Sequence, residues 1–82
     1  MENKTVKVTI KDSVGALPRV IQIFARRGFA IEEIHATTAG ENKEVTITFP
    51  ADDYIKKIVL GQLNKLTDSI EVCERTKSND NE

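Results

Sequence analysis

Two segments of this sequence alternate strictly between apolar and polar side chains, a pattern typical of a half-buried β-strand. The apolar members are Val6, Val8 and Ile10 in residues 5–10, and Val45, Ile47 and Phe49 in residues 44–49. Successive side chains of a strand point to opposite faces of a sheet, so each segment gathers its apolar residues on one face. We therefore expect both strands in a sheet that is covered on one side only.

The first of these strands leads into a segment with the spacing of an amphipathic helix. Its apolar face is predicted to consist of Leu17, Val20, Ile21 and Phe24. Asp12 or Ser13 is expected to cap the start of this helix, and Gly28 is expected to end it.

A second helix is predicted after Pro50, with Asp52 or Asp53 as its cap. Its apolar positions hold helical spacing and are Ile55, Ile58, Val59, Leu63 and Leu66. Gly61 lies inside it at a cost of about 1 kcal/mol relative to alanine.

Two further strands complete the pattern. Residues 29–38 are predicted to form one of them, with a bulge because Ile31 and Ile34 lie an odd number of residues apart. Residues 39–43 are predicted to form a polar hairpin loop, and Ile70 and Val72 a short last strand.

The resulting order, β-α-β-β-α-β, predicts an α+β fold of the ferredoxin-like type. In this two-layer sandwich, two helices cover one face of a four-stranded antiparallel sheet. The open face is predicted to be polar and to carry Thr5, Lys7, Thr9, Glu33, His35, Thr37, Thr46, Thr48, Glu71 and Cys73. We expect one domain over residues 5–74, an N-terminal extension over residues 1–4 and a disordered tail over residues 75–82, which lack apolar side chains.

Composition argues against several functions. The 82 residues carry 12 Lys and Arg against 13 Asp and Glu, which is not the basic footprint of a nucleic-acid-binding protein. The open sheet face offers no aromatic side chain on which RNA bases would stack. One cysteine and one histidine make neither an internal disulfide nor a zinc site, and the loop at residues 11–16 lacks the cysteines of a metal chaperone. We expect no metal, no cofactor and no catalysis by this chain alone.

No apolar run approaches the roughly 20 residues needed to span a bilayer, and the first residues lack the apolar core of a signal peptide. The sequence therefore predicts a cytoplasmic protein that does not bind membranes.

The loop from Asp12 to Leu17 is the main candidate site, because it joins a strand to the start of a helix. Free backbone N–H groups and the positive end of the helix dipole attract a small anion such as an amino-acid carboxylate. The alternative is an ordinary capped turn, and spacing alone does not exclude it.

Three motifs carry a resemblance to a known family. They are Gly15-Ala-Leu17, Arg27-Gly-Phe-Ala-Ile-Glu32 and Gln62-Leu-Asn-Lys-Leu66. With these motifs the chain resembles an ACT domain over nearly all of residues 5–74. More narrowly, it is similar to the regulatory small subunit of acetolactate synthase (acetohydroxyacid synthase), of the short type with a single ACT unit.

The resemblance implies a non-catalytic subunit that associates with the thiamine-diphosphate-dependent catalytic subunit and raises its activity. In many members it also implies feedback inhibition by valine. The effector of that family lies between two ACT domains, held by the first loop of one and the start of the second strand of the other. By position, the contacts here would be Asp12, Ser13, Val14, Gly15, Ala16 and Leu17 on one side and Ala30 and Ile31 on the other.

Two of these positions depart from the pattern of valine-responsive members, which usually have asparagine where this chain has Asp12 and Ala30. A carboxylate at position 12 repels the effector's carboxylate, and alanine forms no side-chain hydrogen bond. We therefore expect weak or absent inhibition by valine.

The leading hypothesis is a homodimer that pairs edge to edge through the second strand and binds the catalytic subunit, with a branched-chain amino acid as possible effector. So small a domain buries little core, which favours association. One alternative is a free-standing ACT amino-acid sensor that controls another enzyme, and another is an interaction module that uses the threonine-rich sheet face.

His35 and Cys73 are interpreted as ordinary surface or edge residues. Arg26 and Arg27 form either a solvated helix end or a contact to the catalytic subunit.

Overall fold

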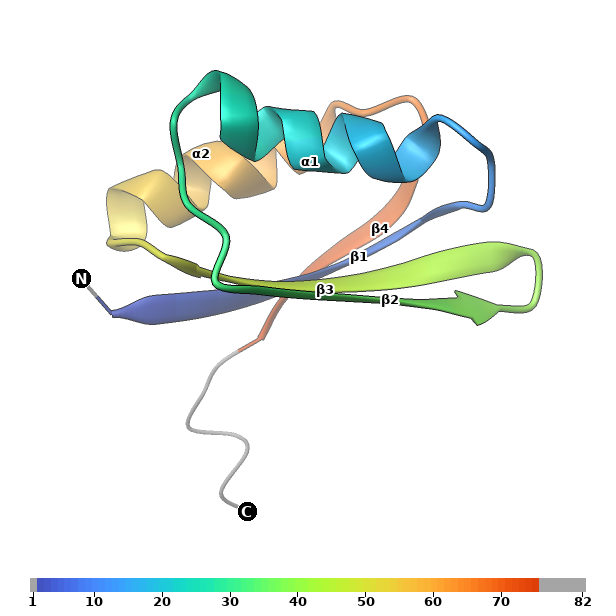
Figure 1. The fold of residues 1–82 in the computed structure, drawn as a ribbon, viewed down its shortest axis with the longest axis horizontal. Helices are drawn as coiled ribbons and strands as arrows, with labels where there is room; N and C mark the ends of the chain where they lie inside the picture. Colours follow the sequence, from blue (N-terminus) through green and yellow to red (C-terminus); the bar gives the residue numbers. More distant parts are fainter. Residues whose placement is uncertain (1, 76–82) are drawn as a thin grey trace, which may run out of the picture.

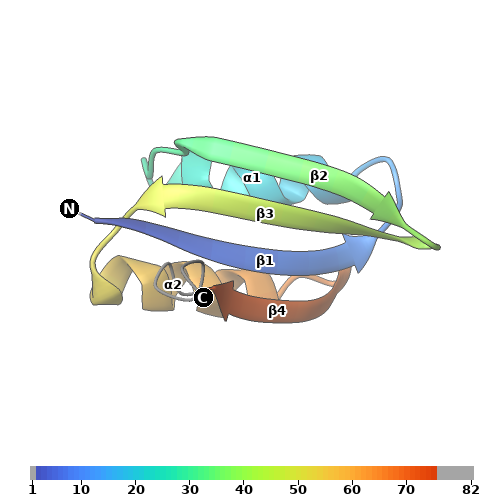
Figure 2. The ribbon, with the colours of Figure 1, turned by 90° about the horizontal axis from the view of Figure 1, so that it is seen from below.

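The structure, a computed structural model, describes residues 2–75. Four strands and two helices follow in the order β1 (Asn3–Lys11), α1 (Ala16–Arg26), β2 (Glu33–Ala39), β3 (Asn42–Pro50), α2 (Asp53–Asn64) and β4 (Ser69–Arg75). Both helices lie on one side of the sheet (Figure 1). The strand order is β2-β3-β1-β4 with antiparallel neighbours (Figure 2), which confirms the predicted ferredoxin-like fold.

The two alternating segments form the centre of the sheet. β1 and β3 pair over nine residues, and Val6, Val8 and Ile10 face the helices together with Val45, Ile47 and Phe49. All six side chains are fully buried, as the alternation predicts. β1 begins at Asn3, two residues before the predicted start, because Asn3 and Lys4 pair with Pro50 and Phe49.

α1 packs on this apolar surface through Ala16, Val20 and Phe24. The rings of Phe24 and Phe49 meet edge to face with 5.0 Å between their centroids. The prediction that Ile21 lies in the core is wrong, because its side chain is 40% exposed. The buried stripe of α1 is rotated away from Ile21, and Ile23 packs against the core instead.

α2 begins as predicted at a capping aspartate. The side chain of Asp52 accepts a hydrogen bond of 2.8 Å from the Ile55 N–H, which satisfies one of the free donors at the start of the helix. Val59 and Leu63 are fully buried and join the same core as α1.

The prediction for the second strand is wrong at its start. β2 begins at Glu33, and its register with β3 continues without a bulge to Ala39. Ile31 lies in the connection after α1 and packs against the core from there, so the odd spacing to Ile34 reflects the start of the strand. The predicted loop over residues 39–43 is shorter than expected, because Gly40 and Glu41 alone form the turn and Gly40 adopts a φ of 64°.

The irregularity in the sheet lies instead between β1 and β4. Thr9 pairs with Glu71 but Ile10 pairs with Ser69, which leaves Ile70 as the extra residue of a bulge, 50% exposed. β4 extends to Arg75, so position 75 belongs to a strand and not to the predicted tail. The rest of that predicted tail, residues 76–82, lies outside the described residues.

Two edges and one face of the sheet remain uncovered. β2 is paired on one side only, and each of its seven residues is exposed. The open face carries the predicted threonines, of which Thr5 and Thr48 share a hydrogen bond of 3.1 Å between their hydroxyls. Within residues 2–75, neither helix has the length and apolar character required to cross a membrane.

Candidate functional site

The loop between β1 and α1 turns tightly and presents its side chains to solvent. The Ser13 N–H donates to the Lys11 carbonyl over 2.9 Å, and the Ala16 N–H donates to the Ser13 carbonyl over 3.2 Å. The prediction that Asp12 or Ser13 caps α1 is wrong, because Gly15 is the N-cap and no side chain accepts a hydrogen bond there. Val14 at the tip of the loop is 98% exposed.

Free donors remain at the start of α1, as expected for a helix without a capping side chain. Within residues 2–75, the backbone N–H groups of Val14, Gly15 and Leu17 have no acceptor. These donors and the positive end of the helix dipole have the chemistry to hold a carboxylate. Ala16, which the resemblance also assigned to the effector, is fully buried and contributes to the core instead of to the loop surface.

A lysine that sequence reasoning missed lies beside this loop. Lys43 is the register partner of Ile10, and its ammonium lies 3.6 Å from the Asp12 carboxylate and 3.4 Å from the Thr38 hydroxyl. The positive charge of Lys43 offsets part of the negative charge of Asp12. Only the register between β1 and β3 brings Asp12 and Lys43 together, so no local motif would have found the pair.

Arg19 holds the other side of the loop. Its guanidinium pairs with Asp68, and a Cβ atom added to Gly15 would lie 3.3 Å from its Nη2 atom. The Asp68 carbonyl also accepts a hydrogen bond of 3.0 Å from the Lys11 N–H. The segment before β4 thus fixes both ends of the first loop.

The second group of predicted site residues lies at the opposite end of α1. Ala30 is exposed and Ile31 is half-buried, and both follow Gly28, whose φ of 71° ends the helix. α1 spans eleven residues, about 16 Å, between this connection and the first loop (Figure 1). One chain therefore does not bring the two groups together.

The remaining titratable candidates lie on the open sheet face. His35 Nε2 lies 3.1 Å from Glu33 Oε2, and both side chains are exposed. The Cys73 thiol donates to Glu71 Oε2 over 3.4 Å, and this hydrogen bond, with burial and the charge of Glu71, raises the pKa of the thiol above its usual value. Within residues 2–75, no three His, Cys, Asp or Glu side chains lie close enough to hold a metal ion.

Comparison with known proteins relates this fold and loop to one family. Residues 6–71 match the model of the AHAS small subunit-like ACT domain. The chain is 38% identical over 90% of its length to a probable acetolactate synthase small subunit of Archaeoglobus fulgidus, and 37% identical over 87% to an acetolactate synthase small subunit of Mycobacterium bovis. These alignments cover 48% and 44% of the two relatives, so the chain spans about half their length.

A solved structure supports the fold. The crystal structure of an acetolactate synthase small subunit from Thermotoga maritima superposes with a TM-score of 0.86 at 22% identity, over 98% of this chain and 51% of that one. The family model covers most of the chain and includes the first loop, both helices and the β2–β3 hairpin. The chain belongs to the family of AHAS small subunit-like ACT domains.

Proposed function

We propose that this chain is a non-catalytic regulatory subunit of an acetolactate synthase, which binds the thiamine-diphosphate-dependent catalytic subunit and raises its activity. The observation that carries the proposal is the family match over residues 6–71, within the domain that we assign to residues 5–74. The names of the relatives from Archaeoglobus fulgidus and Mycobacterium bovis support the same role.

In this proposal two chains pair through their β2 edges. β2 is a regular seven-residue strand with one unpaired edge, and its Ile34 side chain is 36% exposed. A long, flat edge with apolar side chains favours pairing with a second strand. The other edge strand, β4, is interrupted by the bulge at Ile70 and carries the charges of Glu71 and Glu74, features that disfavour edge pairing.

Antiparallel pairing of two β2 edges would complete the effector site. The first loop lies near the end of β2 and Ala30 precedes its start, so a two-fold axis between the strands brings the loop of one chain to Ala30 and Ile31 of the other. The free N–H groups of the loop supply donors for an amino-acid carboxylate. The distance of about 16 Å between the two groups within one chain supports a site that requires two copies.

Valine binds weakly in this proposal. Asp12 repels the effector's carboxylate, although its ion pair with Lys43 reduces that repulsion, and the methyl side chain of Ala30 offers no hydrogen bond. Replacing both residues, Asp12→Asn with Ala30→Asn, is expected to strengthen valine binding. Isothermal titration calorimetry with valine, leucine and isoleucine measures this change, and an unchanged dissociation constant contradicts the assigned contacts.

The experiment that tests the role itself is co-elution with the acetolactate synthase catalytic subunit encoded in the same genome. A regulatory subunit elutes with the catalytic subunit from a gel-filtration column at micromolar concentration. A free-standing amino-acid sensor, the alternative, elutes alone and still binds an amino acid in calorimetry. Separate elution of the two proteins would therefore contradict the subunit role and leave the sensor role standing.

A further inference from the structure

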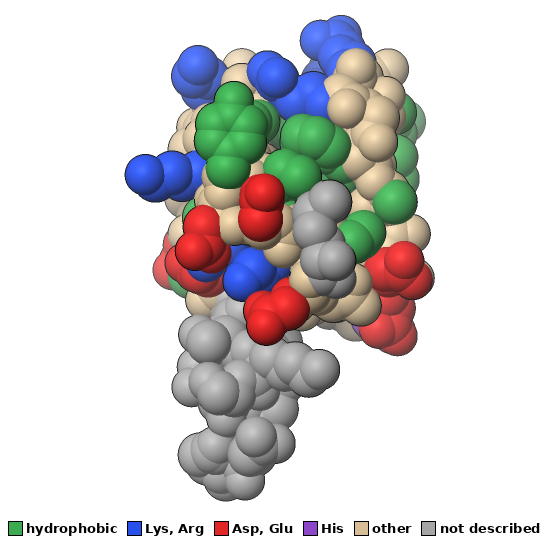
Figure 3. Space-filling view, turned by 90° about the vertical axis from the view of Figure 1, so that its left-hand side faces the viewer, with side chains coloured by type: hydrophobic (Ala, Val, Ile, Leu, Met, Phe, Trp, Pro, Cys, Tyr) green, Lys and Arg blue, Asp and Glu red, His purple; other side chains and the backbone are tan. Residues whose placement is uncertain are grey.

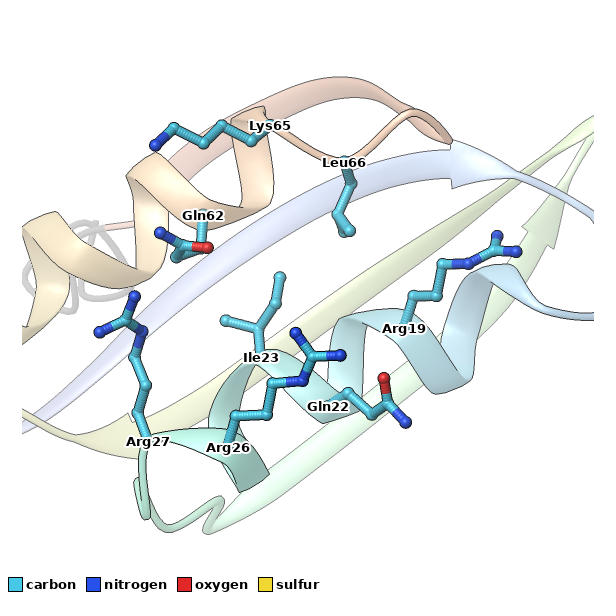
Figure 4. A pocket seen from close by; sticks show the side chains of 8 residues that line it. All are labelled: Arg19, Gln22, Ile23, Arg26, Arg27, Gln62, Lys65 and Leu66. Atoms are coloured by element: carbon cyan, nitrogen blue, oxygen red, sulfur yellow. The ribbon is translucent and has the colours of Figure 1, made fainter.

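A groove of about 590 Å³ lies between α1 and α2 on the side of the helices that faces away from the sheet (Figure 4). We call it the α1–α2 groove. Its cationic side chains are Arg19, Arg26, Arg27 and Lys65, and its floor contains Ile23 and Leu66. In Figure 4, Ile23 and Leu66 point toward one another, and Arg27 reaches toward α2.

Three of the four cations in this groove are not neutralised. Arg19 pairs with Asp68, but Arg26, Arg27 and Lys65 form no ion pair with any carboxylate within residues 2–75. Figure 3, which views the end of the molecule where α1 ends and α2 begins, shows Lys and Arg side chains over the helices and most Asp and Glu side chains nearer the sheet. A chain of net charge −1 therefore concentrates positive charge on its helix layer.

The arrangement of these cations argues against a compact anion. Arg19 and Arg26 lie seven residues apart on α1, about 10 Å along its axis, whereas one phosphate group gathers its donors around a single point. Six of the eight lining residues are charged or amide side chains, including Gln22 and Gln62, and a small-molecule pocket is mostly apolar. An elongated rim of cations with an apolar floor matches an extended or helical protein segment.

We infer that the α1–α2 groove docks an acidic segment of the catalytic subunit, with carboxylates against Arg26, Arg27 and Lys65 and an apolar side chain over Ile23 and Leu66. This inference rests on the proposed function and names the surface that carries it. The groove is lined by residues of the helix layer, whereas the proposed dimer pairs through the sheet edge at β2, so we expect pairing to leave the groove open. Arg19 joins the groove to the first loop, because its guanidinium also lies against Gly15.

Charge reversal within and outside the groove tests this inference. Arg26→Glu and Lys65→Glu each place a negative charge in the groove, and Lys57→Glu makes the same change at an exposed position of α2 that does not line it. All three residues are exposed, so the variants are expected to fold. The affinity of the full chain for the catalytic subunit is measured by biolayer interferometry at 0.05 M and 0.5 M NaCl.

Each groove variant is expected to raise the dissociation constant about tenfold or more at low salt, and Lys57→Glu less than threefold. Raising the salt should weaken binding of the unmodified chain more than that of the groove variants. Equal effects of all three substitutions would overturn the inference while the proposed function survives. Failure of the unmodified chain to bind would overturn both.

The same variants also test whether the groove binds a compact anion instead of a protein segment. Calorimetry with inorganic tripolyphosphate measures whether the chain alone binds such an anion. Tripolyphosphate binding that Arg26→Glu abolishes, together with unchanged affinity for the catalytic subunit, would assign the groove to a small anion and overturn the inference. Absence of tripolyphosphate binding together with the tenfold losses supports the protein segment.

Discussion

Arg19, in the first turn of α1, forms an ion pair with Asp68, which lies 49 positions later in the chain, just before β4. The pair holds the Arg19 guanidinium against Gly15 of the first loop and at one end of the α1–α2 groove. The proposed effector loop and the proposed docking surface thus share one side chain. The position of that side chain depends on a carboxylate from the opposite end of the sequence.

The first prediction concerns this ion pair. Asp68→Asn removes the charge from a mostly buried carboxylate and is expected to lower the free energy of unfolding by about 1 kcal/mol, measured by urea denaturation. Asp53→Asn is the control, because Asp53 is almost fully exposed and its ion pairs with Lys4 and Lys56 are long, at 3.6 and 3.8 Å. Equal losses in the two variants would show that the Arg19–Asp68 pair has no special role.

The second prediction uses two glycines that differ in backbone conformation. A Cβ added at Gly61 or at Gly28 would meet nothing within 4 Å, but Gly28 has a φ of 71° and Gly61 lies inside α2. Gly61→Ala is therefore expected to stabilise the fold by about 0.5 to 1 kcal/mol, and Gly28→Ala to destabilise it by about 1 kcal/mol or more. Thermal unfolding of the two variants checks the opposite signs, and shifts in the same direction contradict the assignment.

The third prediction concerns pH. A hydrogen bond to Glu74 and the charge of that residue raise the pKa of Lys56 above its ordinary value of 10.5, although desolvation partly opposes the rise. As the pH rises through 10.5, the unfolded chain loses this proton before the folded chain does, so the free energy of unfolding falls. Below that pH the stabilisation is fully present.

Lys56→Met should remove the part of the fall in the free energy of unfolding at alkaline pH that this lysine causes, and Glu74→Gln should reduce that part. Urea denaturation at pH 8 and at pH 11 measures the difference for each protein. If the free energy of unfolding falls as much between pH 8 and pH 11 in Lys56→Met as in the unmodified chain, other groups, among them Cys73, account for the whole pH dependence.

The fourth prediction tests the β2 edge. Ile34→Glu places a charge in the proposed dimer seam, and Ile70→Glu places the same charge at the exposed bulge of β4. By multi-angle light scattering at micromolar concentration, the unmodified chain and Ile70→Glu are expected at twice the chain mass of 9.2 kDa, and Ile34→Glu at the mass of one chain. If Ile70→Glu dissociates the dimer and Ile34→Glu does not, the dimer interface lies at β4 and not at β2.

The regular parts of the fold were predictable because residues close together in the sequence determine each of them. The alternation around Val8 and around Ile47 predicts the two central strands, and Asp52 predicts the start of α2. The predicted start of the second strand was wrong because Ile31 packs against the core from a connection. In the sequence, an apolar residue of this kind cannot be told from an apolar residue inside a strand such as Ile34. Ile21 has correct helical spacing, and its exposure depends on which stripe of α1 turns toward the sheet.

The candidate site was predictable only in its loop. The turn from a strand into a helix singled out Asp12 through Leu17, and the resemblance added Ala30 and Ile31. Both groups stay predictions, and the free N–H groups of the loop have the chemistry that the first of these two predictions requires. Lys43 and Asp68 could not be found, because strand register and the packing of a distant segment bring them to the loop. The burial of Ala16 likewise follows from how α1 sits on the sheet.

The regulatory role is tested most directly by the initial rate of acetolactate formation. The catalytic subunit from the same genome is assayed alone and with increasing concentrations of the chain, up to saturating excess. The unmodified chain is predicted to raise this rate. At subsaturating concentration the groove variant Arg26→Glu is predicted not to raise it, whereas Lys57→Glu is predicted to raise it as the unmodified chain does. An unchanged rate at every concentration of the chain would contradict the proposed function.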